Sequence, residues 1–149
     1  MPTTYAAQIL WVAIIAACAF GLIKGGPAER VGAGMVLLIS IAFVIVNELV
    51  PELGRPVPHL VLDGVLALVF LALAVRYASL WIGAVMLLQG VQFSLHAYFF
   101  VTKLTPGVSY AIVNNLVTWA TLLGVVLGTL AYMRHSRAAA VSDTMTPTV

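Results

Sequence analysis

The sequence predicts an all-α membrane protein, a bundle of five transmembrane helices joined by short loops. Hydrophobic residues make up 62% of the 149-residue chain and charged residues only 8%, which is too little polar surface to cover a water-soluble protein of this size. The apolar residues fall into five runs, and glycine, proline and charged residues occupy the breaks. We therefore expect a single transmembrane domain over 1–137, with helices over about 6–23, 31–50, 60–75, 80–101 and 108–133.

The clearest break separates the first two helices and spans Lys24–Arg30. Its two glycines let the chain turn, and Pro27 suits the first turn of the following helix, where a missing N–H leaves no hydrogen bond unmade. Glu29 is then expected near the positive end of that helix. Asn47 and Glu48 fall at the far end of the same helix, where both side chains need hydrogen-bonding partners.

The next two breaks differ in kind. Residues 51–59 hold three prolines and a glycine, which predicts a rigid, extended loop. A third helix over 60–75 would follow, with Asp63 in its first turn. Only Arg76–Ser79 separates it from the fourth helix, so these two helices should form a tight antiparallel hairpin.

The fifth helix carries Gly124 and Gly128 four residues apart. This spacing is typical of close helix packing, either within the bundle or between copies of the protein. Residues 138–149 lack an apolar face and are expected to form a mobile cytoplasmic tail.

The positive residues predict how the bundle sits in the membrane. With five spans, Lys24, Arg30, Arg76, Arg134 and Arg137 lie on the side of the C-terminus, whereas Arg55 and Lys103 lie on the other side. The positive-inside rule then places the N-terminus outside and the C-terminus in the cytoplasm.

Polar residues inside the spans are the candidate functional residues. Gln89, Gln92 and His96 share one face of the fourth helix because they are three and four residues apart. Such groups need partners inside a bilayer, and the predicted topology puts the other polar residues at a similar depth in the outer leaflet. The expected polar cluster or pocket consists of Asn47, Glu48, Asp63, Gln89, Gln92, His96, Asn114 and Asn115.

Three hypotheses follow from this cluster. In the first, its members satisfy each other and fix helix neighbours, and the protein is an accessory or scaffolding subunit of a membrane assembly. In the second, the cluster lines a pocket or path open to the outside, as in a small-solute or proton/ion-coupled transporter or channel subunit. In the third, His59 and His96 hold a metal or haem in a membrane redox subunit.

Other classes of function find little support in the sequence. A net charge of +2 from scattered Lys and Arg residues excludes the basic patch that nucleic-acid binding requires. The chain holds no catalytic motif and no spaced set of metal ligands, so we expect no enzymatic activity and no cofactor. The expected partners are the lipid bilayer and either further copies of this chain or other membrane subunits.

The aromatic residues are expected mainly at the membrane interfaces. Trp11, Trp81 and Tyr110 lie near predicted helix ends, where amphipathic rings favour the headgroup region.

The Gly25–Arg30 junction, the compact apolar spans and the abrupt Arg76–Trp81 turn resemble those of an uncharacterised type of small bacterial multi-span inner-membrane protein. The resemblance implies a location in the bacterial inner membrane. It implies no activity, and it assigns no functional residue.

Overall fold

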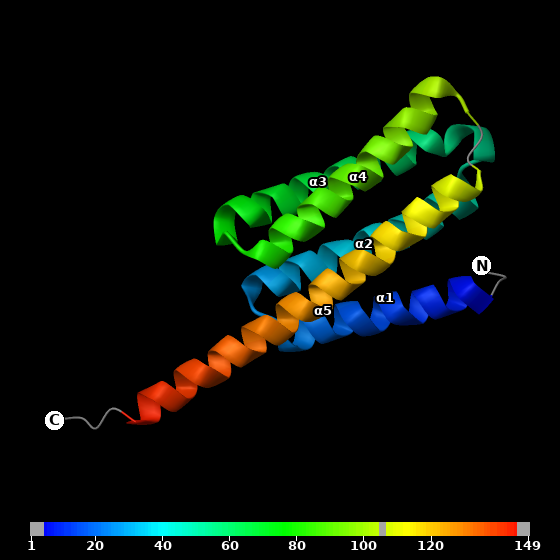
Figure 1. The fold of residues 1–149 in the computed structure, drawn as a ribbon. Helices are drawn as coiled ribbons and strands as arrows, with labels where there is room; N and C mark the ends of the chain where they lie inside the picture. The colour runs from blue at the N-terminus through cyan, green and yellow to red at the C-terminus, as the bar shows by residue number, and fades with distance from the viewer. Residues whose placement is uncertain (1–4, 105–106, 146–149) are drawn as a thin grey trace.

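The computed structural model describes residues 5–104 and 107–145, and it confirms an all-α bundle of five helices over these residues (Figure 1). All five helices are long and apolar enough to cross a membrane. The helices are α1 Tyr5–Lys24, α2 Pro27–Leu49, α3 Pro56–Tyr77, α4 Leu80–Thr102 and α5 Val108–Met145, with a short 3₁₀ helix, η1, at Glu52–Gly54.

The helices pack as a closed ring. Helix α1 contacts α2 and α5, α2 contacts α3, α3 contacts α4, and α4 returns to α5. Because the chain alternates direction, α1, α3 and α5 begin at the same end of the bundle, and α2 and α4 end there. We call this the N-terminal end, and the other the opposite end (Figure 1).

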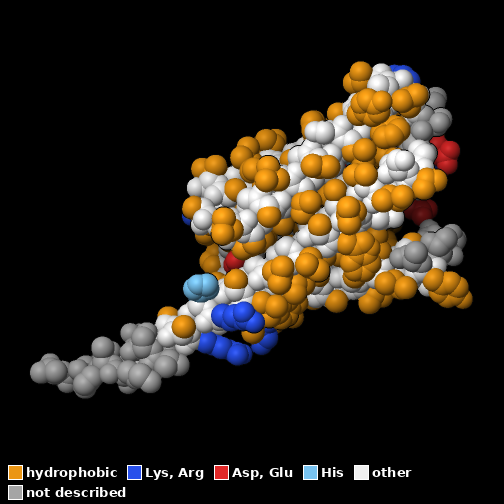
Figure 2. All heavy atoms as spheres, in the orientation of Figure 1, with side chains coloured by type: hydrophobic (Ala, Val, Ile, Leu, Met, Phe, Trp, Pro, Cys, Tyr) orange, Lys and Arg blue, Asp and Glu red, His pale blue; other side chains and the backbone are white. Residues whose placement is uncertain are grey.

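The outer surface of the bundle is apolar. Large hydrophobic side chains that are more than 60% exposed include Val12 of α1, Leu68 of α3 and Leu123 of α5. Figure 2 shows apolar side chains over most of the visible face, and Lys and Arg side chains gathered where α5 leaves the bundle. An apolar belt with charges at its ends suits a lipid environment, so the chain is an integral membrane protein.

Helices α3 and α4 form the predicted antiparallel hairpin. Helix α3 ends at Tyr77, and Ala78 adopts a left-handed backbone conformation with φ of 46° while its N–H donates to the Ala74 carbonyl. Ser79 returns to an extended conformation before α4 begins at Leu80. Two residues are therefore enough to reverse the chain.

The prediction of an extended loop over 51–59 was wrong, because α3 begins at Pro56 rather than near Leu60. Prolines in a first helical turn lose no hydrogen bond, since those N–H groups have no partner within the helix. Arg55 holds the junction by donating to the carbonyls of Asn47 and Val50 at the end of α2, both at 2.8 Å. Asp63 is therefore beyond the first turn of α3, and it is only 2% exposed.

Helix α5 is longer than the predicted 108–133, since it continues to Met145. Residues 138–145, which we expected to belong to a tail, are helical. The segment is rich in alanine and holds no proline before Pro147, so helix propensity extends the helix after the apolar face has ended. The last part of the expected tail, 146–149, lies outside the described residues.

The two glycines of α5 pack within the bundle. A Cβ atom added to Gly124 would lie 2.5 Å from a Val85 methyl group, and one added to Gly128 would lie 2.5 Å from the Trp81 ring. Gly21 of α1 is similar, because its Cβ would lie 2.8 Å from that of Ala33. These glycines let α5 approach α4, and α1 approach α2, in the half of the bundle near the opposite end.

We expect Gly128→Ala to destabilise the bundle by about 1–3 kcal/mol, because the added methyl group overlaps the Trp81 indole. The measurement is unfolding of the purified protein in mixed micelles as the denaturing detergent fraction rises. Gly83→Ala is the matched control, since a Cβ there meets no atom within 4 Å. Equal stability of the two variants would contradict the α4–α5 packing described above.

Candidate functional site

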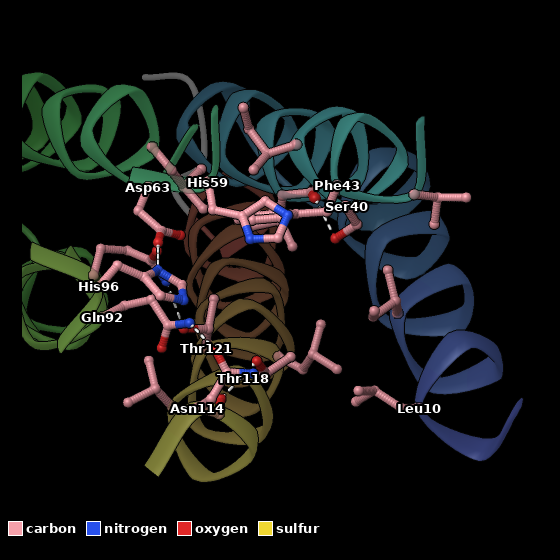
Figure 3. Close-up of a pocket in the computed structure, with 18 of the residues that line it drawn as sticks. Leu10, Ser40, Phe43, His59, Asp63, Gln92, His96, Asn114, Thr118 and Thr121 are labelled. Atoms are coloured by element: carbon pink, nitrogen blue, oxygen red, sulfur yellow. Dashed lines mark hydrogen bonds and ion pairs between the residues drawn. The ribbon is translucent and has the colours of Figure 1, made fainter. Parts of the chain in front are cut away.

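A cavity of about 340 Å³ lies inside the N-terminal half of the bundle, and all five helices line it (Figure 3). Its lining residues come from the first halves of α1, α3 and α5, and from the middle and second half of α2 and α4. Asn47, a lining residue near the end of α2, is exposed. The cavity thus reaches toward the N-terminal end and does not continue through the other half of the bundle.

The two sides of the cavity differ in polarity. Figure 3 shows Asp63, His96, Gln92 and Asn114 together on one side, with Leu10 across from them. We call the first side the polar wall; it consists of Asp63, Gln89, Gln92, His96, Tyr110, Asn114, Thr118 and Thr121, from α3, α4 and α5. We call the second side the apolar wall; it consists of Leu10, Trp11, Ile14, Val36, Ile39, Phe43 and Val44, from α1 and α2.

Helical spacing builds the polar wall. On α4, Gln89, Gln92 and His96 follow one another at three and four residues, so their side chains leave the same face. The polar residues of α5 repeat at similar intervals, and α5 packs directly on α4. The two stripes therefore meet along the α4–α5 contact; the α5 members are Tyr110, Asn114, Thr118 and Thr121.

A chain of hydrogen bonds through His96 links three helices. His96 Nδ1 contacts Asp63 Oδ2 of α3, and His96 Nε2 contacts the Tyr110 hydroxyl of α5. The Asp63 and His96 side chains are only 3% and 9% exposed. With an ionised Asp63 and a neutral imidazole, Nδ1–H donates to the carboxylate and Nε2 accepts from the tyrosine hydroxyl. This arrangement satisfies both ring nitrogens of His96.

The two glutamines of α4 bond to α5 at successive levels. Gln89 Nε2 donates to the Thr121 hydroxyl at 2.9 Å. Gln92 Nε2 donates to the Asn114 side-chain oxygen. Hydrogen bonds between membrane helices contribute roughly 0.6 kcal/mol each on average, so these pairs mainly fix the register of α4 against α5.

Two buried polar atoms of lining residues, His59 Nε2 and Gln92 Oε1, have no hydrogen-bonding partner within the part of the chain that the structure describes. The His59 ring packs against Phe43, with ring centroids 5.0 Å apart, and lies 6.2 Å from the His96 ring. Buried polar atoms are rarely left without a partner. Both residues line the cavity, although the two atoms themselves are covered by neighbouring groups.

The charge of the lining is uneven. Among the lining residues that the structure describes, Asp63 is the only one with a formal charge at neutral pH when histidine is neutral, and none is Lys or Arg. Arg55 is directed instead to the end of α2 and to Glu52, 3.8 Å away. On this formal count the lining holds one negative charge beside an apolar surface.

The structure brings together Asp63, Gln89, Gln92, His96 and Asn114 of the predicted cluster. Asn47 lines the cavity at its exposed rim. Glu48 and Asn115 are exposed and do not line it. Each of these two follows a lining residue directly, and one step along a helix turns the side chain by about 100°, which takes it off the wall.

Tyr110 is the main functional candidate that the sequence reasoning missed, since we expected it at a membrane interface. Its signal was present in the polar stripe of α5, because Tyr110 lies four residues before Asn114. Trp11, also expected at an interface, lines the cavity. His59, which was also considered as a metal ligand, lines the cavity beside the cluster.

The hypothesis of a metal or haem on His59 and His96 gains no support from the geometry. Both ring nitrogens of His96 are already bonded. Within residues 5–104 and 107–145, no group of three or more His, Cys, Asp or Glu side chains is placed to hold a metal ion.

A smaller polar contact lies in the other half of the bundle. Glu29, 7% exposed in the first turn of α2, accepts a hydrogen bond of 3.2 Å from the Trp81 indole N–H of α4. We expected Glu29 near a helix terminus and Trp81 at an interface, but not this pairing. The contact satisfies the indole N–H and links α2 to α4.

Comparison of the chain with protein-family models, with curated proteins and with solved structures finds no match in any of the three. The function is therefore inferred from the geometry of the cavity.

Replacing His96 should reveal the cost of burying Asp63 alone. We expect His96→Leu to destabilise the protein by about 3 kcal/mol or more, because it leaves a buried carboxylate without its partner. Asp63→Leu combined with His96→Leu should recover at least half of that loss. The check is a double-mutant cycle on detergent unfolding, with the exposed His135→Leu as control. Additive losses from the two single variants would contradict the pairing.

Proposed function

We propose that this membrane protein binds a small solute in its cavity and acts as the solute-binding accessory subunit of a larger assembly in the bacterial inner membrane. The observation that carries this proposal is a polar wall that faces empty volume instead of another helix. The volume of about 340 Å³ falls within the range of pockets that hold small molecules.

A self-satisfied polar plug explains the site less well. In such a plug every buried polar atom would bond to another member, whereas His59 Nε2 and Gln92 Oε1 have no partner. The apolar wall also offers few groups that can bond to the polar wall, since Ser40 donates to the Val36 carbonyl of its own helix at 2.7 Å.

Binding also fits the site better than catalysis or an open pore. Both ring nitrogens of His96 are engaged, by Asp63 and by the Tyr110 hydroxyl, which leaves neither free to act on a solute in the cavity. The half of the bundle beyond the cavity is closely packed, with Cys18, Ala33 and Val125 at 0% exposure. Transfer of a solute across the membrane would then need movement or partner subunits, which favours the accessory role.

Solute binding can be tested with Asn114 and Asn115, which are adjacent in the chain but differ in exposure. A panel of small amines, alcohols, carboxylates and sugars is added to the protein in lipid nanodiscs, and its thermal unfolding is followed. A bound solute at about 100-fold excess over its Kd should raise the unfolding midpoint by a few degrees. Asn114→Leu, on the polar wall, should lose the effect, and Asn115→Leu, on the exposed surface, should keep it.

The proposal fails if no compound stabilises the wild-type protein. It fails equally if Asn114→Leu and Asn115→Leu respond alike, because stabilisation would then arise from the surface or the lipid.

We also propose that the cavity lies in the outer leaflet. Arg55 and Lys103 lie at the N-terminal end of the bundle, where α2 and α4 finish. The other positive residues lie toward the opposite end, either at helix ends or along the part of α5 that continues past the bundle, and the positive-inside rule puts that end in the cytoplasm. These residues are Lys24, Arg30, Arg76, Arg134 and Arg137.

The orientation is testable because the only cysteine, Cys18, is fully buried. In intact spheroplasts, a membrane-impermeant maleimide should label Lys103→Cys and should label Arg137→Cys only after lysis. The wild-type protein provides the background. The reverse pattern would place the cavity in the inner leaflet.

A further inference from the structure

We infer that the solute is an organic cation, an amine with a compact apolar body, and this inference rests on the proposed solute-binding function. The three features that select this class are the charge of the cavity, its unpartnered polar atoms and its apolar wall.

The charge of the lining separates cations from anions. Asp63 is the only described lining residue with a formal charge when histidine is neutral. A carboxylate or phosphate ligand would add a second negative charge to a site with little water, where like charges repel strongly. An ammonium group would instead neutralise the charge of Asp63.

The acceptor atoms of the lining residues favour a ligand that donates hydrogen bonds. Gln92 Oε1 is buried without a donor, and it can only accept. The Asp63 carboxylate can accept several hydrogen bonds and is bonded through Oδ2 to His96. A protonated amine supplies donors and no acceptor, so it suits the Asp63 carboxylate, and Gln92 Oε1 would accept from it once the side chain turns toward the cavity.

The apolar wall suits the rest of such a ligand. Ile14, Val36 and Ile39 are only 5–6% exposed and line the side away from Asp63. Trp11 and Phe43 also line the cavity, and their ring faces attract cations. Figure 3 shows Phe43 beside His59, on the apolar side of the pocket. A bare inorganic cation would leave this surface unused.

Three probes of nearly equal shape test the inference: benzylamine, benzyl alcohol and benzoate. Binding to the wild-type protein in nanodiscs is measured by titration calorimetry, with empty nanodiscs subtracted. Benzylamine should bind about tenfold or more tightly than benzyl alcohol, because a hydrogen bond to a charged group is stronger than one between neutral groups. Benzoate should not bind measurably.

Asp63→Asn should remove the preference for benzylamine over benzyl alcohol, because it keeps the shape of the side chain without its charge. Glu48→Gln is the matched control, since Glu48 is exposed at the same end and does not line the cavity. The comparison of probes on the wild-type protein stands even if Asp63→Asn fails to fold.

The outcomes separate the two proposals. If benzyl alcohol or benzoate binds as tightly as benzylamine, and Asn114→Leu abolishes that binding, the cavity binds solutes but the assignment to cations is wrong. If benzylamine binds and Asp63→Asn keeps its preference, the assignment is wrong as well. If none of the three probes binds to folded wild-type protein while another compound of the panel stabilises it, the assignment to a compact apolar amine is wrong and solute binding stands; if no compound of either set binds, both proposals are contradicted.

Discussion

The structure depends on a carboxylate buried in an apolar bundle. Asp63 is 2% exposed in a helix surrounded by hydrophobic residues, where an unpaired charge would be very costly. His96 meets that need from α4 and extends the contact to Tyr110 of α5. Three helices are thereby held in one arrangement at the same depth. Gln89 and Gln92 then fall in register with Thr121 and Asn114.

The cavity follows from an unequal distribution of small residues. Near the opposite end, Gly21, Gly124 and Gly128 let neighbouring helices approach until their surfaces touch. In the N-terminal half, the polar wall occupies the faces of α3, α4 and α5, while α1 and α2 present mainly branched apolar side chains. The apolar side chains of α1 and α2 form no hydrogen bonds with the polar wall. The cavity lies between the two walls. The half of the bundle near the opposite end is thus closely packed, and the N-terminal half contains the cavity.

Much of the fold was predictable from the sequence because lipid imposes simple rules. Five apolar runs predicted five helices, and the short Arg76–Ser79 break predicted the α3–α4 hairpin. The ends of helices were harder to predict, because they depend on local backbone chemistry. Pro56 starts a helix instead of preventing one, and an alanine-rich segment carries α5 to Met145.

The candidate site was predictable to the extent that helical spacing decides it. The intervals between Gln89, Gln92 and His96 located one face of α4 correctly as part of the polar wall. Glu48 and Asn115 were expected in the polar cluster because they are polar. Their side chains leave the helix in another direction, and neither lines the cavity. Tyr110 was hidden by the general preference of aromatic residues for interfaces. The volume of the cavity has no signature in the sequence, because it arises from how α3, α4 and α5 pack against α1 and α2.

The length of α5 has a mechanical consequence. Its 38 residues span roughly 57 Å, whereas the hydrocarbon core of a bilayer is about 30 Å thick. Even with a tilt, some 20 Å of continuous helix must project beyond the lipid. Figure 1 shows this helix leaving the bundle and extending well past its neighbours. The segment beyond the lipid is therefore a rigid continuation of the same helix that carries Tyr110 and Asn114 in the cavity wall.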